Sequence, residues 1–335
     1  MTITPDMRVD ETLRRFPRTR AVFNRHGLGG CGGVSGPPET IEFFAKLHGG
    51  NLETFLQELN ESLSQEALPG RIVEVPDTLY RLFVRTAVVM FLTGGATAGT
   101  VLLGYKTAYA LEWLPKMEGW AAHVQAHGHV QIFGWVALFI LGISYHVVPR
   151  FLGTELRRRE LAVASFWLML GGILLTAYFQ PLAQHAWAAH WLVIAAGLEF
   201  VAALFFLLAI RATARRSGAA PAVHTAYLMA GTSWFLIGTL ATFALAIERL
   251  TSGRSFIPPA ADEAYLHILL VGFVSMFILG VSLRTLPVFL GLRVPSDGAS
   301  KVALLLLNLG VAAAALGHLW ERPVVVAFAV GGETL

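Results

Sequence analysis

The sequence predicts an all-α polytopic membrane protein with a small helical domain at its N-terminus. Hydrophobic residues make up 55% of the 335 residues and charged residues 14%, a balance that is unusual for a soluble globular domain. Residues 1–75 carry an ordinary density of charge, and from about Leu79 long apolar runs dominate. We therefore expect a helical domain at 1–70, a linker at 71–82 and a membrane domain at 83–335.

Seven apolar runs are long enough to cross a bilayer, which takes about 20 helical residues. They lie at about 83–105, 126–148, 161–180, 188–210, 225–247, 265–288 and 301–318. Arginine and lysine cluster after the second, fourth and sixth runs, whereas the turn between the third and fourth contains neither. By the positive-inside rule we expect a cytoplasmic N-terminus, in a membrane of the bacterial inner-membrane type.

The membrane domain contains an internal repeat. Shifted by 138 residues, HGHVQIFGWVALFILGISYHVVPRFLG (127–153) lies over YLHILLVGFVSMFILGVSLRTLPVFLG (265–291), and 12 of the 27 positions are identical. The first and third spans similarly overlay the fifth and seventh, so the predicted unit is four helices. Two such units need eight spans. An eighth run at Pro323–Gly332 is short, so either the last helix is very short or the chain is a truncated form of a longer one.

The repeat makes one histidine the leading site candidate. His129 recurs as His267, whereas His127 is replaced by Tyr265. His123 and His127 are four residues apart and share a helix face, but His127 and His129 differ by about 200° and cannot reach one ligand on a regular helix. Because a histidine is costly in lipid, we expect His129 and His267 to face the bundle interior.

Two imidazoles on facing helices are a common way to hold a haem iron in a helical bundle. We therefore predict haem at His129 and His267, with Gly134 and Gly272 admitting a helix or a flat ring. The plainer interpretation is that each histidine hydrogen-bonds a neighbouring helix. A copper or other metal site is a further alternative, at histidines near the outer surface: His123, His127, His185 and His190.

Two other membrane residues carry separate expectations. His146 lies about 25 Å along the second span from His129, too far to share its site, and is replaced by Arg284 in the repeat. We expect both to act as anchors at the cytoplasmic interface. Glu199 lies within the fourth span and is a candidate proton acceptor or hydrogen-bond partner of a histidine.

The second-span sequence HGHVQIFGWVALFILGISYHVVPRF resembles the histidine-bearing helix of the heme-copper oxidase subunit I superfamily and of NnrS-type membrane proteins. The resemblance covers about 250 residues, is specific in the second and sixth spans, and implies haem binding in nitric oxide or nitrite stress. The chain has two four-helix units where the oxidase fold has three. It also lacks the His-Pro-Glu-Val-Tyr-like motif or histidine pair of a copper–haem centre. The resemblance therefore does not imply oxygen reduction or proton pumping.

The N-terminal domain reads as four short helices around a glycine-rich turn, GLGGCGGVSGPP (27–38). FPRTRAVFNRHGLGGCGG followed by ETIEFFAKLHGGNLETFLQELN resembles the small N-terminal domain of the ScdA/Ric di-iron repair proteins. That family has paired cysteines, where this chain has Gly30 and Cys31. Cys31 is then either incidental to an interaction module or a redox-sensitive thiol, for which its pKa would have to be low. As the single cysteine it excludes an internal disulfide.

These patterns leave three functional hypotheses open, and whether the protein is an enzyme is undecided. The first is a membrane haem protein in nitric oxide or redox stress, with a cytoplasmic partner for the N-terminal domain. The second is a quinol-linked reductase of nitric oxide or oxygen, which needs a redox partner and a second metal. The third is a cofactor-free transporter or assembly factor, which needs discontinuous helices and an intramembrane carboxylate. The charge pattern indicates a lipid bilayer and not nucleic acid as partner.

Overall fold

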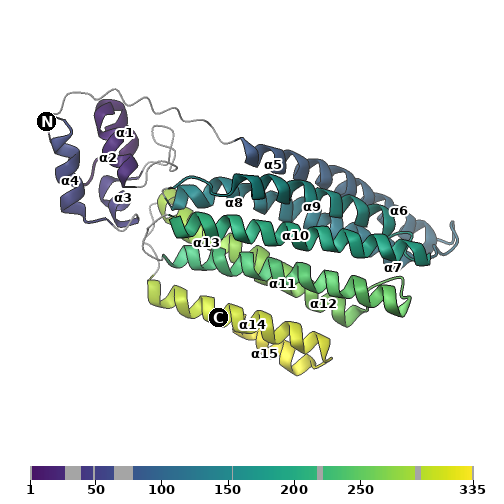
Figure 1. The fold of residues 1–335 in the computed structure, drawn as a ribbon. Coiled ribbons are helices and arrows are strands. Elements are labelled where there is room, and N and C mark those ends of the chain that lie inside the picture. Colours follow the sequence, from purple (N-terminus) through teal and green to yellow (C-terminus); the bar gives the residue numbers. More distant parts are fainter. Residues whose placement is uncertain are drawn as a thin grey trace.

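A computed structural model of the chain describes residues 2–26, 39–47, 50–63, 78–152, 154–216, 222–290 and 296–333. The described chain is a small helical domain followed by a bundle of long helices, and the small domain lies at one end of the bundle (Figure 1). The all-α prediction is confirmed: in the described ranges β pairing is limited to one isolated bridge, between Arg8 and Thr40. The glycine-rich turn, Cys31 and most of the expected linker lie outside the described residues.

The N-terminal domain consists of the four helices that the sequence predicts. They are α1 (Val9–Arg15), α2 (Arg20–Arg25, after a 3-10 turn η1 at Pro17–Thr19), α3 (Ile41–Leu47) and α4 (Leu52–Glu61). Asn51 starts α4 because its Oδ1 accepts the backbone N–H groups of Glu53 and Thr54, which have no partner inside the helix. The core contains Phe23, Phe44 and Phe55, all fully buried.

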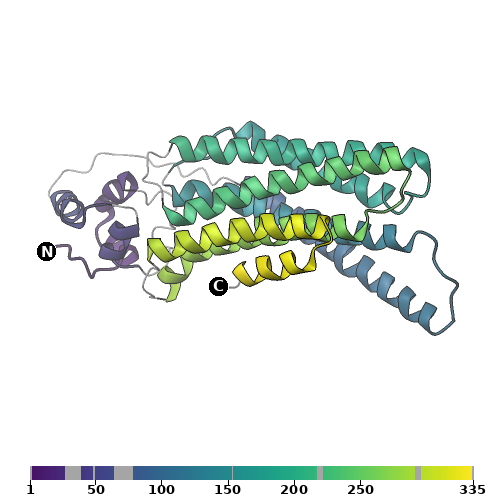
Figure 2. The ribbon, with the colours of Figure 1, turned by 90° about the horizontal axis from the view of Figure 1, so that it is seen from below.

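The membrane domain contains seven helices that are long and apolar enough to cross a bilayer, as predicted. In chain order they are α5–η4–α6 (Leu79–Met90, Phe91–Thr97, Ala98–Ala110), α7–η5–α8 (Trp120–His129, Val130–Ala137, Leu138–Phe151), α9 (Arg159–Phe179), α10 (Ala186–Arg216), α11 (Val223–Ser252), α12–η6–α13 (Pro259–His267, Ile268–Ser275, Met276–Leu290) and α14 (Asp297–Leu319). The first span begins at Leu79, four residues before the expected start. The short eighth run forms α15 (Pro323–Glu333), which packs on α14 (Figure 2).

The helix boundaries reproduce the 138-residue repeat. The π-helical segments η5 and η6 begin at Val130 and Ile268, which are 138 residues apart, and each directly follows one of the twin histidines. Helices α9 and α14 begin at Arg159 and Asp297, again 138 apart. The repeat is not complete in local geometry, because the first span contains the π segment η4 whereas α11 is α-helical throughout.

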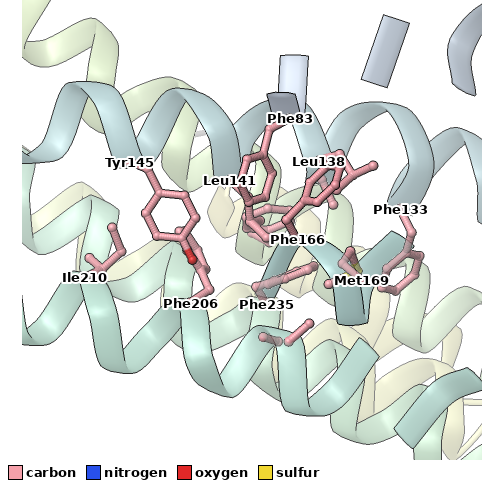
Figure 3. Close-up of a cluster of buried hydrophobic side chains, with 14 of the residues drawn as sticks. Phe83, Phe133, Leu138, Leu141, Tyr145, Phe166, Met169, Phe206, Ile210 and Phe235 are labelled. Atoms are coloured by element: carbon pink, nitrogen blue, oxygen red, sulfur yellow. The ribbon is translucent and has the colours of Figure 1, made fainter. Parts of the chain in front are cut away.

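A continuous aromatic core fills the middle of the bundle. Figure 3 shows Phe133, Phe166, Phe206 and Phe235 converging from four different helices, together with Tyr145. These phenylalanines are at most 1% exposed, and the Phe235 ring stacks on Phe273 of η6 with a centroid distance of 4.3 Å. These buried rings join four helices into one apolar core.

The two domains meet at a buried charge pair. Glu39 precedes α3 and is 6% exposed, and its carboxylate interacts electrostatically with Arg284 of α13, which is 4% exposed. Burial raises the pKa of Glu39 to about 7 and outweighs the opposing effect of the Arg284 guanidinium. Arg284 thus lies enclosed at the end of the bundle next to the N-terminal domain, and its role as an interfacial anchor stays a prediction.

This pKa predicts a dependence of stability on pH. Between the ordinary value of 4.5 and about 7 the folded state binds more protons at Glu39 than the unfolded state, so the free energy of unfolding falls as pH rises through this window. We expect Glu39→Gln to be more stable than wild type by about 3 kcal/mol at about pH 8, and to match it near pH 4.5. Thermal unfolding followed by circular dichroism tests this. Glu42→Gln, at an exposed position on α3, should keep the wild-type profile, and an unchanged profile in Glu39→Gln would contradict the assignment.

Candidate functional site

A small polar cavity lies in the half of the bundle away from the N-terminal domain. Its volume is about 40 Å³, room for about three water molecules. The cavity is lined by residues of the second to the sixth spans and of the connection before the sixth span. They are Gln125, His129, Thr176, Gln180, Leu192, Ala196, Glu199, Thr242, Ala246, Arg249, Ile257 and Tyr265. Because Gln180, Arg249 and Ile257 come from helix ends and Glu199 from the middle of α10, the cavity runs from the end of the bundle toward its centre.

The inner end of the cavity is formed by His129 and Glu199. His129 Nε2 and Glu199 Oε1 share a hydrogen bond of 2.7 Å, and the two side chains are 11% and 1% exposed. Phe133, one turn further along the second span, stacks on the imidazole with a centroid distance of 4.3 Å and an interplanar angle of 13°. The second carboxylate oxygen, Oε2, is buried with no hydrogen-bond partner among the described residues. A buried carboxylate with one oxygen unpaired is costly, so this pair favours holding a proton or a ligand.

Helix α9 comes unusually close to this pair. At Gly172 an added Cβ would lie 2.5 Å from Glu199 Cγ and 2.7 Å from the carbonyl oxygen of Ala195. The absence of a side chain at Gly172 thus lets α10 carry Glu199 directly against α9, which limits the rotamers that the carboxylate can adopt.

The outer end of the cavity is closed by a hydrogen-bonded network. Gln125 Nε2 donates to the carbonyl of Ile257 (2.9 Å), and the Ile257 N–H donates back to Gln125 Oε1 (3.0 Å). Arg249 Nη1 donates to Gln180 Oε1 (2.8 Å), and Arg249 Nη2 donates to the carbonyl of Ser255 (2.9 Å). Gln180 Nε2 lies 3.5 Å from Gln125 Oε1, so the two halves of the network touch. Tyr265 completes the lining and is hydrogen-bonded to Asp262.

The neighbouring histidines of the second span have separate partners. His127 Nδ1 lies 3.0 Å from the carbonyl oxygen of Gly94, in the π segment of the first span. His123 Nδ1 lies 3.0 Å from the Gly119 carbonyl at the start of its own helix. His127 and His129 thus point to different helices, as their angular separation predicts. His146 lies 2.8 Å from Arg150 Nη1 through Nδ1, and its ring is tilted by 43° against that of Tyr80 at a centroid distance of 4.3 Å.

His267 does not share the environment of His129. It is not among the cavity-lining residues, and its ring lies 6.1 Å from that of His318 on α14. His318 in turn lies 3.0 Å through Nδ1 from Glu263, whose side chain is 62% exposed. The twin histidines therefore occupy equivalent places in the repeat but contact different neighbours.

The two predicted cofactor glycines are used for helix packing in the structure. A Cβ at Gly134 would lie 3.2 Å from Met90, and one at Gly272 would lie 2.8 Å from Trp234. The sequence left open whether a helix or a flat ring approaches these glycines, and the described contacts are those of a helix.

The surroundings of His129 are those of a small cavity and not of an open haem pocket. Small-molecule ligands and cofactors occupy pockets of about 300–1,000 Å³, far more than the cavity beside His129. His129 Nε2, a nitrogen that would bind iron, is held by Glu199. For copper, the described residues contain no group of three or more His, Cys, Asp or Glu side chains arranged to hold a metal ion. Haem and copper therefore stay predictions from the sequence.

Sequence reasoning identified His129 and Glu199 separately and missed the rest of the cavity. Gln125, Gln180 and Arg249 stand at the ends of apolar runs, where polar residues are ordinary. A signal did exist: all three precede or follow spans on the side where arginine and lysine are otherwise scarce.

The close approach at Gly172 gives a test of the geometry. We expect Gly172→Ala to lower the free energy of unfolding by about 1–3 kcal/mol, because its methyl group overlaps Glu199 and the α10 backbone. Gly171→Ala is the matched control, since its Cβ would meet only Leu198, at an ordinary 3.7 Å. Denaturation of the purified protein in detergent measures both. Equal stability of the two variants would contradict the packing described here.

Comparison with known proteins adds no relative: the chain matches no protein-family model, no curated protein and no solved structure.

Proposed function

We propose that this chain is a proton-coupled integral membrane protein of the transporter class, with His129 and Glu199 as its proton-binding pair. The observation that carries the proposal is the 2.7 Å hydrogen bond between two ionisable side chains buried at the inner end of a polar cavity. Ionisable groups inside a membrane domain are expensive and usually mark a path for protons, ions or substrates. We place the protein in a bacterial-type inner membrane with its N-terminus in the cytoplasm, as the arginine distribution indicates.

The pair suits reversible proton binding. A carboxylate and an imidazole in contact can hold one mobile proton as an ion pair or as two neutral groups, and small changes in solvation shift the balance. Glu199 Oε2 has no partner among the described residues, so it is free to accept a hydrogen bond from water or a ligand in the cavity.

Access to the pair is one-sided, which favours coupling over a simple channel. Thr242 and Tyr265 line the cavity on the side away from the N-terminal domain. Toward the other side, Phe206 follows Glu199 by seven residues, about 10 Å along α10, and belongs to the aromatic core (Figure 3). A site whose cavity reaches toward one side, with packed helices of a repeat closing the other side, is what alternating access requires.

Infrared difference spectroscopy tests the assignment of the proton. Protein in lipid vesicles is titrated from about pH 8 to about pH 5 and the carbonyl stretch of protonated carboxyl groups is followed. We expect a band from Glu199, absent in Glu199→Gln and shifted in His129→Gln, beside a second band from Glu39, which Glu39→Gln identifies. Glu118→Gln, an exposed residue before α7, should leave both bands unchanged. If Glu199→Gln keeps every band of the wild-type protein, the proposed proton-coupled function is wrong.

A second candidate function is a haem protein of nitric oxide or redox stress, as the NnrS-like and ScdA/Ric-like resemblances imply. One structural observation favours it: each twin histidine is the last residue before a π-helical segment, and such segments are frequent at functional sites. This alternative requires the helices packed around His129 to move apart when haem binds. A quinol-linked reductase would further need a second metal, and the N-terminal domain with Cys31 would serve as a docking or sensing module.

An absorption spectrum separates the two candidates. If the haem alternative holds, protein purified from haem-supplied cells shows a reduced-minus-oxidised haem absorption signal. The amplitude of this signal falls at least tenfold in both His129→Ala and His267→Ala. His185→Ala, whose ring stacks on Trp187 away from the cavity, is the matched control. A colourless wild-type protein would leave the proton-coupled proposal standing alone.

A further inference from the structure

The connection between α11 and α12 crosses the outer end of the cavity. We name residues 253–258 the strap; it lies at the end of the bundle opposite the N-terminal domain (Figures 1 and 2). Its Ile257 lines the cavity that contains His129 and Glu199. Both ends of the strap are fixed in position. Gly253 ends α11 in the left-handed conformation at φ 70°, which an L side chain rarely adopts, and Pro258 and Pro259 start α12.

Two side chains from the bundle hold the strap down. Gln125 makes two hydrogen bonds to the Ile257 backbone, one as donor and one as acceptor. Arg249 donates to the Ser255 carbonyl and at the same time to Gln180. These contacts join α7, α9 and α11 to one short loop, and all three side chains, Gln125, Gln180 and Arg249, also line the cavity.

Ile257 is the strap residue that packs against the hydrophobic core, where it is partly buried. Within the strap Phe256 is 42% exposed, and Arg254 reaches outward to Glu248 with a side chain that is 55% exposed. A loop held by a few hydrogen bonds and little packing opens at far lower free energy than the helices on which it lies.

The same side chains therefore serve the cavity and the strap. Gln125 has one amide group, and both its oxygen and its nitrogen are used on Ile257. An occupant of the cavity that takes a hydrogen bond from Gln125 or Arg249 must compete with the strap for it. Occupancy and opening are thus coupled through these two residues.

We propose that the strap is a lid over the His129–Glu199 cavity, with Gln125 and Arg249 as its latches, and that it controls access from the side opposite the N-terminal domain. The inference that this lid gates protons or substrate rests on the proposed function above. The closure itself rests on the hydrogen bonds and on the packing of Ile257.

Thiol labelling tests the lid directly, because the chain has one cysteine. In a Cys31→Ser background, Ala246→Cys places a reporter thiol on the cavity wall, at a position 8% exposed. The full-length protein in phosphatidylcholine vesicles is treated with a membrane-impermeant, cationic thiosulfonate reagent. We expect slow labelling with the latches intact, and labelling about tenfold faster after Gln125→Ala, which removes both hydrogen bonds to Ile257.

Two further variants make the result specific. Gln125→Asn keeps the amide but shortens its reach, so an intermediate rate is expected with little risk to folding. Arg254→Ala changes a strap residue whose described side-chain partner is Glu248 on the protein surface. The Ala246→Cys thiol in this variant should be labelled at the background rate. Equal labelling rates in the background and both Gln125 variants, with all of them folded by gel filtration, would overturn the lid. This readout does not depend on whether Glu199 takes up a proton, so it can fail or succeed independently of the infrared titration.

Discussion

The constraint on which this structure depends is the cost of a polar group in hydrocarbon. Seven spans bring few ionisable side chains into the membrane domain, and those that are deeply buried need a partner. Glu199 is fully buried and finds His129 on a helix that is 70 residues away in sequence. That hydrogen bond adds to the packing of Tyr145 on Phe206 between the second and fourth spans, and it defines the inner end of the cavity. Gln125, Gln180 and Arg249 then gather at its outer end, where they can satisfy one another.

The π-helical segments explain how the second span serves two neighbours at once. A π segment replaces i→i+4 by i→i+5 hydrogen bonding and so inserts one residue, which rotates the following helix face by about 100°. His127, in α7 before η5, reaches the Gly94 carbonyl on one side, and Phe133, within η5, joins the aromatic core on the other. In η4 the carbonyl of Gly94 accepts from a histidine of a different helix. The irregular backbone is therefore part of how the site is built.

The sequence was sufficient to predict the elements and the repeat but not the partners. Apolar length identifies spans because a bilayer has one thickness, and self-similarity identifies the repeat without any knowledge of contacts. The partner of His129 could not be predicted in the same way, because a buried pair depends on which helices are adjacent and on close approaches such as that at Gly172. Periodicity also assumes 3.6 residues per turn, an assumption that η4, η5 and η6 break. Gly134 and Gly272 illustrate the limit: small residues predict a close approach but do not say whether a ring or a helix makes it.

The divergence of the twin histidines follows from their neighbours. Duplication copies a residue and its backbone, here down to the π segment that follows it, but it does not copy what the opposite helix presents. Against His129, α10 presents a carboxylate enclosed by α9; against His267, α14 presents His318, with Glu263 largely exposed beside it. A hydrogen bond to a carboxylate is stronger and more sensitive to protonation where water is excluded. The His129–Glu199 pair, buried at the inner end of the cavity, is for this reason the one that we propose as the proton site.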